Sequence, residues 1–180
     1  MGTLFVDNIK HESAQGSGTI TLGASGETVA MASGASVGAG MGKVLQAKQT
    51  IFTSGVLTTA AFPVEVPGFT LSITPISTSN KILITLDCSV SINIDYWVFA
   101  GIRRDSTDLG RQRVSPYVGH YDMKTVTMSV LDSPSSTSAL TYKAVWGAHT
   151  TGGNCTFNHR PDHSNTTNGY AALTALEIAG

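Results

Sequence analysis

The sequence predicts an all-β protein whose larger part is an antiparallel β-sandwich of the jelly-roll type. Apolar and polar residues alternate with period two over many short segments, which is the pattern of strands with one buried face. Turn-forming Gly, Pro, Ser, Asn and Asp separate these segments, and no long stretch combines helical periodicity with capping residues. Because no helices are available for crossover connections, the strands are expected to pair antiparallel.

The first 42 residues differ from the rest. Gly, Ala and Ser dominate residues 1–42, and the few apolar residues cannot form a core of their own. Short alternating runs at 19–22 and 28–31, with a turn-like segment at 23–26, predict two strands that each lack a partner layer. Association of several chains around one axis would supply that layer, and disorder is the alternative. This segment is therefore predicted to be an extended arm or a β-shaft shared by several copies of the chain.

Residues 43–180 carry longer strands and are predicted to form the sandwich. The clearest strand is Ile82–Ile94, in which apolar residues alternate with an almost wholly polar outer face. Cys88 falls on its inner face and is expected to be a buried thiol, as is typical of free cysteine. Further strands are expected at 44–52, 56–62, 68–74, 95–103, 123–131, 139–147 and 171–178.

Composition limits the possible partners. The 180 residues are 41% hydrophobic but only 13% charged, with a formal net charge of -1. A chain without a net positive charge is not drawn to nucleic acid or to anionic membranes, so neither is an expected partner. No apolar run approaches the length of a membrane-spanning helix, and the N-terminus lacks a secretory signal. We therefore expect a soluble protein that is made in a cytosol and recognises its partners through local surfaces.

The sequence predicts no enzyme. A GxSxG match at 34–38 lies in a low-complexity tract without the strand and helix that a nucleophilic serine needs. The Gly-rich run at 38–43 lacks two positions of a phosphate-binding loop, because Val37 and Val44 replace the required Gly and Ser/Thr. No carboxylate pair stands out for glycoside hydrolysis, although a depolymerase remains the enzymatic alternative.

No cofactor or metal site is predicted either. His149, Cys155, His159, Asp162 and His163 are the only concentration of metal-ligating residue types, but a proline and a polar run place the last of them in a loop. The alternative is one histidine per chain around a metal on a trimer axis. Trp97 and Trp146 lie within strand patterns and are expected in the core.

A basic cluster suggests where a partner binds. Four arginines flank a turn with two aspartates near residues 103–113, and they are either solvated hairpin charges or a patch for an acidic glycan. Aromatic residues that often grip sugars or proteins follow directly. We expect the loops at 104–122 and 147–170 to contact a receptor through Arg111, Arg113, Tyr117, His120, Tyr121, His159, Asp162, His163 and Tyr170.

Several segments carry a resemblance to a known class of protein. They are Leu4–Ser13, 16–29, 42–46, 72–75, 79–84, 131–134, 138–143 and 174–178. Together they are similar to tail-fibre and related virion proteins of marine bacteriophages. The resemblance implies a trimeric appendage of the virion, with an N-terminal part that attaches or forms a shaft and a C-terminal sandwich that faces the host.

These observations lead to one expected function and one alternative. The leading hypothesis is a homotrimeric fibre or spike whose sandwiches bind a bacterial surface glycan or outer-membrane component. Other virion proteins would hold the arm, with Leu4, Phe5, Val6 and Ile9 as attachment residues. The alternative is a capsid decoration or cement protein, or a head fibre, that stabilises the virion shell.

Overall fold

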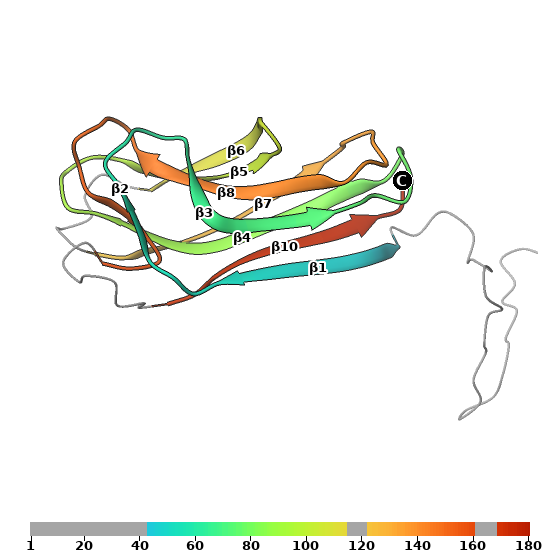
Figure 1. Cartoon of the computed structure of the whole chain (residues 1–180), viewed down its shortest axis with the longest axis horizontal. Coiled ribbons are helices and arrows are strands. Elements are labelled where there is room, and N and C mark those ends of the chain that lie inside the picture. The colour runs from blue at the N-terminus through green and yellow to red at the C-terminus, as the bar shows by residue number, and fades with distance from the viewer. Residues whose placement is uncertain (1–42, 115–121, 161–168) are drawn as a thin grey trace, which may run out of the picture. The chain divides into compact units, whose positions relative to one another are not determined.

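The computed structural model describes residues 43–114, 122–160 and 169–180, which form strands and no helix (Figure 1). This described part therefore contains no helix that is long and apolar enough to cross a membrane. The strands expected at 19–22 and 28–31 and the attachment residues Leu4, Phe5, Val6 and Ile9 lie outside it. The strands are β1 (Val44–Phe52), β2 (Val56–Thr58), β3 (Val64–Ile73), β4 (Lys81–Ile92), β5 (Val98–Arg104), β6 (Thr107–Val114), β7 (Lys124–Asp132), β8 (Leu140–Ala148), β9 (Cys155–Phe157) and β10 (Ala171–Ile178).

The strands form two antiparallel sheets. Sheet A contains β1, β10, β4 and β7 in that order, with β9 and β2 beside the last residues of β4. Val90 of β4 pairs with Lys124 of β7 and also with Phe157 of β9, so β9 follows β10 along the opposite edge of β4. Sheet B has the order β3-β8-β5-β6. The two sheets share one hydrophobic core, which confirms the predicted antiparallel β-sandwich.

Strand β6 is the main difference from the expected elements. The region 104–122 was expected to be a loop, but β6 occupies Thr107–Val114 and pairs with β5, with one irregularity at Leu109. Its sequence contains only two apolar residues, Leu109 and Val114, so it shows no alternating pattern. An edge strand with a polar outer face is held by backbone pairing to its neighbour, and its sequence need not alternate.

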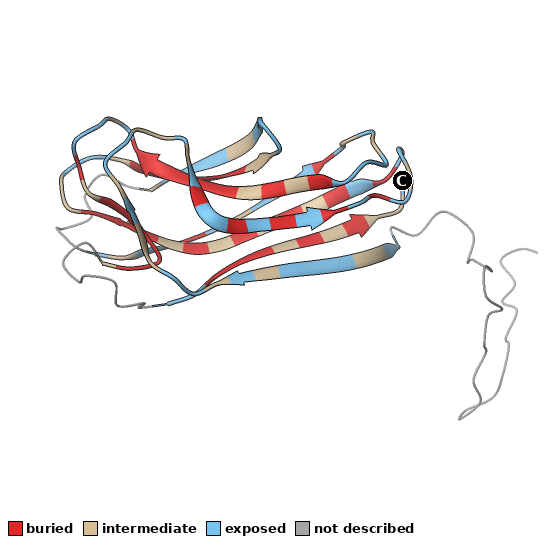
Figure 2. Cartoon of the chain, viewed as in Figure 1, coloured by how far each residue is buried: buried red, intermediate tan, exposed pale blue. Residues whose placement is uncertain are grey.

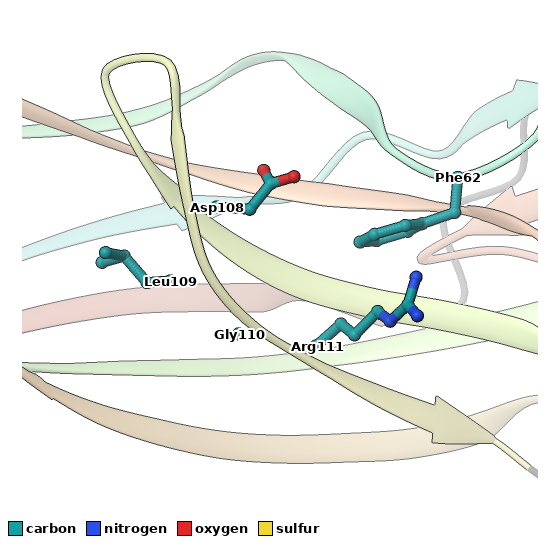
Figure 3. Close-up of a pocket in the computed structure, with 5 residues that line it drawn as sticks. All are labelled: Phe62, Asp108, Leu109, Gly110 and Arg111. Carbon is teal, nitrogen blue, oxygen red and sulfur yellow. The ribbon is translucent and has the colours of Figure 1, made fainter.

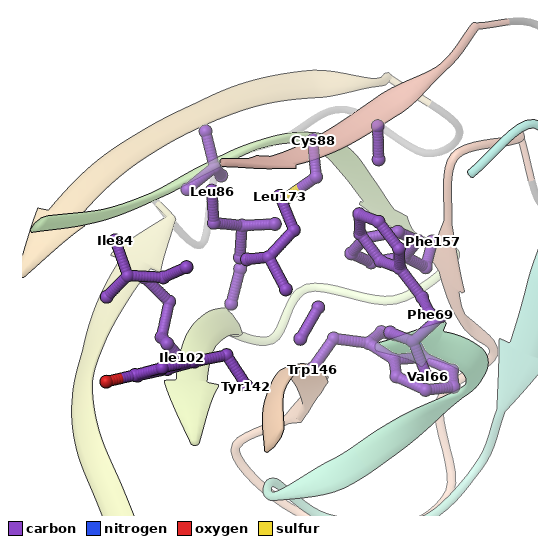
Figure 4. Packing of buried hydrophobic residues seen from close by; sticks show 14 of the residues in the cluster. Val66, Phe69, Ile84, Leu86, Cys88, Ile102, Tyr142, Trp146, Phe157 and Leu173 are labelled. Carbon is purple, nitrogen blue, oxygen red and sulfur yellow. The ribbon is translucent and has the colours of Figure 1, made fainter. Parts of the chain in front are cut away.

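The core is built from the inward faces of both sheets. Buried and more exposed positions alternate along β4, as Figure 2 shows, which confirms the amphipathic strand predicted there. Aromatic rings fill one end of the core: Phe157 lies 5.9 Å from Trp146 and 6.0 Å from Phe69 between ring centroids (Figure 4). Trp146 is fully buried, so its predicted place in the core is confirmed.

Both cysteines are free thiols inside this core. Burial raises the pKa of Cys155 to about 12 and raises the pKa of Cys88 even further, with a smaller contribution from the charge of Asp87. A thiol that stays protonated at neutral pH is a poor nucleophile and metal ligand. Cys88 and Cys155 therefore act as small apolar core residues, as the alternation along β4 predicted for Cys88.

A buried polar network joins the two sheets. Asp132 at the end of β7 accepts hydrogen bonds from Arg104 of β5 and from the hydroxyl of Tyr142 on β8, each at 2.6 Å. Asp132 is 7% exposed and Tyr142 is completely buried. One carboxylate of sheet A thus satisfies a guanidinium and a phenol of sheet B, and this arrangement fixes how the sheets sit on each other.

A second buried carboxylate holds the C-terminal strand. Glu177 of β10 accepts hydrogen bonds from Gln46 of β1 at 2.5 Å, from the Ile76 amide at 2.7 Å and from Asn80 at 2.6 Å. Burial opposes the charged form of Glu177, but these hydrogen bonds and one from the Ser77 backbone outweigh it and hold its pKa below the usual 4.5. The connection between β3 and β4 is thereby fastened to sheet A.

Glu177 is expected to make stability depend on pH. Because its pKa is lower in the folded than in the unfolded chain, its contribution is complete well above pH 4.5 and is lost as the pH falls through the folded value. Glu177→Gln should lower the free energy of unfolding by about 1–3 kcal/mol near neutral pH. The new side-chain NH2 group would face the N–H donors of Gln46, Ile76 and Asn80 and could not accept their hydrogen bonds. Urea unfolding at pH 7 and at pH 3 measures both effects. A variant that loses as much stability at pH 3 as at pH 7 would contradict this role.

Candidate binding site

The outer face of sheet B brings together the two arginines that the sequence singled out. Along β5, Ala100 points into the core, so Phe99 and Gly101 lie on the outer face. The hairpin register places Arg113 opposite Phe99 and Arg111 opposite Gly101. Both arginines are exposed and lie on a strand, which corrects their expected place in a loop.

Two glycines make room for a ring on this face. An ideal Cβ on Gly147 of β8 would lie 2.8 Å from the Phe62 Cα, and one on Gly101 would lie 3.2 Å from the Phe62 Cζ. The Phe62 amide donates to the carbonyl oxygen of Ala148 at 2.9 Å, which fastens the segment before β3 against the sheet. Glycine within a strand commonly marks such a close approach of another backbone. The side chain of Phe62 therefore lies across the outer face of sheet B.

The arginine side chains stack on the aromatic rings of this face. The Arg111 Cζ lies 4.8 Å from the centroid of Phe99 and 5.6 Å from that of Phe62. The Arg113 Cζ lies 4.4 Å from the ring of Trp97, which also meets the His149 ring edge-on at 5.3 Å. Such cation–π pairs contribute about 0.5–1 kcal/mol at exposed sites. We call this set the arginine–aromatic surface; it consists of Phe62, Trp97, Phe99, Arg111, Arg113 and His149.

The charges around this surface are unevenly paired. Arg103, two residue pairs further along the hairpin from Arg111, bonds Asp108 at 2.7 Å and Glu65 at 3.2 Å, and Lys143 bonds Glu65 at 3.1 Å. The hydrogen bond from Lys143, opposed by slight burial and aided by Arg103, holds the pKa of Glu65 below its usual value. Arg111 and Arg113 form no ion pair with any carboxylate of the described residues.

The unpaired guanidinium groups have a defined spacing. Arg111 and Arg113 are two residues apart on one strand face, so their Cα atoms are about 7 Å apart. Stacking on the rings restricts the side chains without using their N–H donors, which stay available for an anion. A hollow of about 250 Å³ adjoins Arg111, lined by Phe62, Asp108, Leu109 and Gly110 (Figure 3). The geometry suits a ligand with anionic groups and flat apolar faces.

Trp97 and His159 are placed differently from their expected positions. Trp97 is half-buried on the outer surface, where the guanidinium of Arg113 stacks on its ring. Its prediction as a core residue was therefore wrong. His159 is only 4% exposed, because its ring packs where Gly55 has no side chain. Its Nδ1 lies 3.3 Å from the Phe157 carbonyl oxygen. A ring so deeply buried cannot touch a receptor, so the prediction of His159 as a contact residue was wrong.

The other expected contact residues divide into two groups. Tyr170 is 67% exposed and lies directly before β10 of sheet A, away from the arginines on sheet B. Within the described ranges no three His, Cys, Asp or Glu side chains gather as metal ligands. The second group of expected contact residues lies outside the described part of the chain: Tyr117, His120, Tyr121, Asp162 and His163.

Sequence reasoning missed most of the aromatic part of the surface. Phe62 and Phe99 were not assigned to a site, His149 was considered only as a metal ligand, and Trp97 was assigned to the core. One signal was present: Trp97 and Phe99 have the same two-residue spacing as Arg111 and Arg113. Pairing them requires the hairpin register, which the polar sequence of β6 conceals.

Comparison with known proteins gives no family. No protein-family model matches the sequence, and no curated protein matches it. Weak structural neighbours include the infectious bursal disease virus Gx strain (TM-score 0.36), a VP2 subviral particle of that virus (0.36) and its Gt strain (0.35), each at 11% identity. They cover 74%, 76% and 76% of this chain, which spans only 38%, 38% and 39% of theirs. At these TM-scores the likeness says nothing about what this chain does.

Proposed function

We propose that this chain is a structural protein of a bacteriophage particle and that its sandwich binds an anionic glycan of the host cell surface. The observation that carries the binding role is the arginine–aromatic surface. Arg111 and Arg113 are held on aromatic rings and have no carboxylate partner among the described residues, while Arg103 and Lys143 on the same face are paired. A uronate- or phosphate-bearing sugar offers both the anionic groups and the apolar ring faces that this surface can receive.

The strand order supports a virion role without determining it. Strands β1-β10-β4-β7 face β3-β8-β5-β6, which is the strand order of a jelly roll. Jelly rolls recur in viral capsid and lectin domains, so this architecture suits a virion protein that binds glycans. Because one fold hosts many functions, the sequence resemblance to phage virion proteins supplies the rest of the virion proposal.

Repetition would raise the affinity of such a site. In a trimer attached to the particle through residues 1–42, three surfaces would engage one glycan chain, and binding would gain from effective concentration. Light scattering on the full chain tests this part of the proposal: a trimer is expected, and the mass of a single chain would contradict it.

Removing both arginines is expected to weaken binding by about 100-fold. Each charge-assisted hydrogen bond contributes about 1.5 kcal/mol, and two such losses correspond to roughly that factor. The measurement compares Arg111→Ala/Arg113→Ala with the unchanged chain by biolayer interferometry against immobilised uronate-bearing and phosphate-bearing polysaccharides. Binding should also fall as salt rises.

A matched double variant separates a specific site from general attraction. Arg103→Ala/Lys143→Ala removes the same charge from the same face, but its side chains are already paired with Glu65 and Asp108. It also takes the Arg103 cation away from Asp108, which lines the hollow beside Arg111, so some loss of binding is expected, but a much smaller one than in the arginine variant. Equal losses in the two double variants would leave only nonspecific charge attraction and would overturn the proposed site.

A decoration protein of the capsid is the second candidate, and one observation favours it. An apolar row crosses the outer face of sheet A, because Ala47 pairs with Leu176, Leu176 with Leu83, and Leu83 with Leu131, which is 52% exposed. Such a row is suited to docking on a shell. Co-sedimentation with empty shells and imaging of the particle with this subunit labelled distinguish the two. A cement protein binds shells, whereas a host-binding protein binds intact cells and leaves shells alone.

A further inference from the structure

The outer face of sheet A contains a hollow that the proposed function does not use. It lies where the register aligns Ile51 of β1, Ala172 of β10 and Asp87 of β4. Ala172 has a small side chain and forms the floor, while Ile51 on one side is 56% exposed. The hollow measures about 520 Å³, and a second one of about 270 Å³ shares Asp87 and Tyr170 with it. Small-molecule sites commonly have volumes of about 300–1,000 Å³.

The polar groups of this hollow are held in place and only partly used. Asp87 Oδ1 accepts a hydrogen bond from Thr127 at 2.7 Å, and the carboxylate forms no ion pair within the described residues. Gln49 donates to Thr174 at 2.9 Å, which leaves its amide oxygen and one N–H for a ligand. Hydroxyls of Thr53 and Thr125 also line the two hollows. The rim therefore offers both donors and acceptors.

Tyr170 supplies an aromatic face beside these groups. Tyr170 is 67% exposed, so much of its ring is accessible to a ligand. A pyranose has the matching chemistry: one apolar face of C–H groups for the ring and neighbouring hydroxyls for the carboxylate and amide. Among the described residues, no Lys, Arg or His lines either hollow, so a ligand carrying negative charge would meet Asp87 without compensation from them.

We infer that the hollow around Asp87 and Tyr170 binds a neutral sugar. Asp87 and Gln49 would each bond a hydroxyl of the sugar, and Tyr170 would cover the apolar face of the sugar ring. This site is on sheet A, whereas the arginine–aromatic surface is on sheet B. It thus adds a second saccharide contact of different charge preference and does not rest on the proposed function.

The test is a titration of the isotope-labelled full chain, followed by amide chemical shifts. The probes are D-glucose, D-galactose, D-mannose and N-acetylglucosamine at millimolar concentrations, the affinity range expected for one sugar ring. At least one probe should shift the amides of residues 49–53, 87–89 and 170–172. Tyr170→Ala and Asp87→Asn should each weaken that probe at least tenfold, and the same spectra report whether the variants are folded.

Two controls make the outcome decisive. Tyr96→Ala removes another exposed tyrosine outside the hollow, and Arg111→Ala/Arg113→Ala removes the other site; both should bind the sugar as the unchanged chain does. The inference is overturned if no probe shifts these amides, if Tyr170→Ala binds equally well, or if choline competes at the same residues and so reveals a cation site. Loss of anionic-glycan binding alone would leave this site standing, and the reverse result would leave the proposed function standing.

Discussion

Replacing Asp132 with alanine is expected to lower the free energy of unfolding by about 3–5 kcal/mol, the usual cost of leaving a buried partner charge uncompensated. The change would strand the guanidinium of Arg104 and the hydroxyl of Tyr142, which both donate to this carboxylate at 2.6 Å. The loss should be large because the network spans the sheets: β7 belongs to sheet A, while β5 and β8 belong to sheet B. Urea unfolding followed by tryptophan fluorescence measures it.

Two variants calibrate that result. Tyr142→Phe removes one donor and leaves the ion pair, so it should cost only about 1 kcal/mol. Asp108→Ala breaks the pair with Arg103 at the surface, where the carboxylate side chain is 48% exposed, and should cost about 1 kcal/mol or less. If Asp132→Ala were no more harmful than Asp108→Ala, the network would not hold the sheets together.

Replacing Gly147 with alanine is expected to cost about 3 kcal/mol of stability and also to weaken anionic-glycan binding. The residue has a φ of 150°, which an alanine adopts only with strain of about 1–3 kcal/mol. A Cβ there would lie 2.8 Å from the Phe62 backbone, and overpacking adds about 1–3 kcal/mol. Relief of the clash would push Phe62 off sheet B and remove one of the two rings under Arg111.

Gly152 provides the control for backbone strain alone. Its φ is 109°, but an added Cβ would meet nothing within 4 Å. Gly152→Ala should therefore cost about 1 kcal/mol or slightly more and leave glycan binding unchanged. The two variants are compared by thermal unfolding and by interferometry. Equal stability and equal binding in both would mean that Phe62 does not depend on the missing side chain of Gly147.

The two proposed sites lie on opposite sheets of the sandwich and differ in the charge of the ligand they would bind. Sheet B presents positive charge on aromatic rings, and sheet A presents a carboxylate beside a tyrosine. A bacterial polysaccharide that contains both uronate and neutral sugars could meet both chemistries on copies of one chain. The two sites can be tested separately, since their hollows have no lining residue in common among the described residues.

Local alternation predicted the strands that have one face in the core. The bounds of β1 and β10 match the expected 44–52 and 171–178, and β4 differs from its expected range by only a few residues. Each of these strands has a buried face, so burial imposes the period of two on its sequence. β6 and β9 were not predicted, because β6 is a polar edge strand and β9 has only three residues.

The candidate sites depend on neighbours that local patterns do not encode. Arg111 was singled out from sequence, but its ring partners Phe62 and Phe99 were not, since Phe62 is brought there by a segment that crosses sheet B. His159 was expected on a loop surface. It is buried instead, because its ring occupies the space left by the missing side chain of Gly55, about a hundred positions away in the sequence.

The sequence by itself determined the fold class, the antiparallel pairing and the inward side of the long strands. Those properties follow from the alternation of side chains along one strand and from turn residues between strands, which are both local. Only the tertiary structure decided which strands are neighbours, in what register, and therefore that Arg111 rests on Phe99 and that Tyr170 adjoins Asp87. Register between distant strands is set by packing of the whole core, and a shift of one residue would separate every one of these pairs.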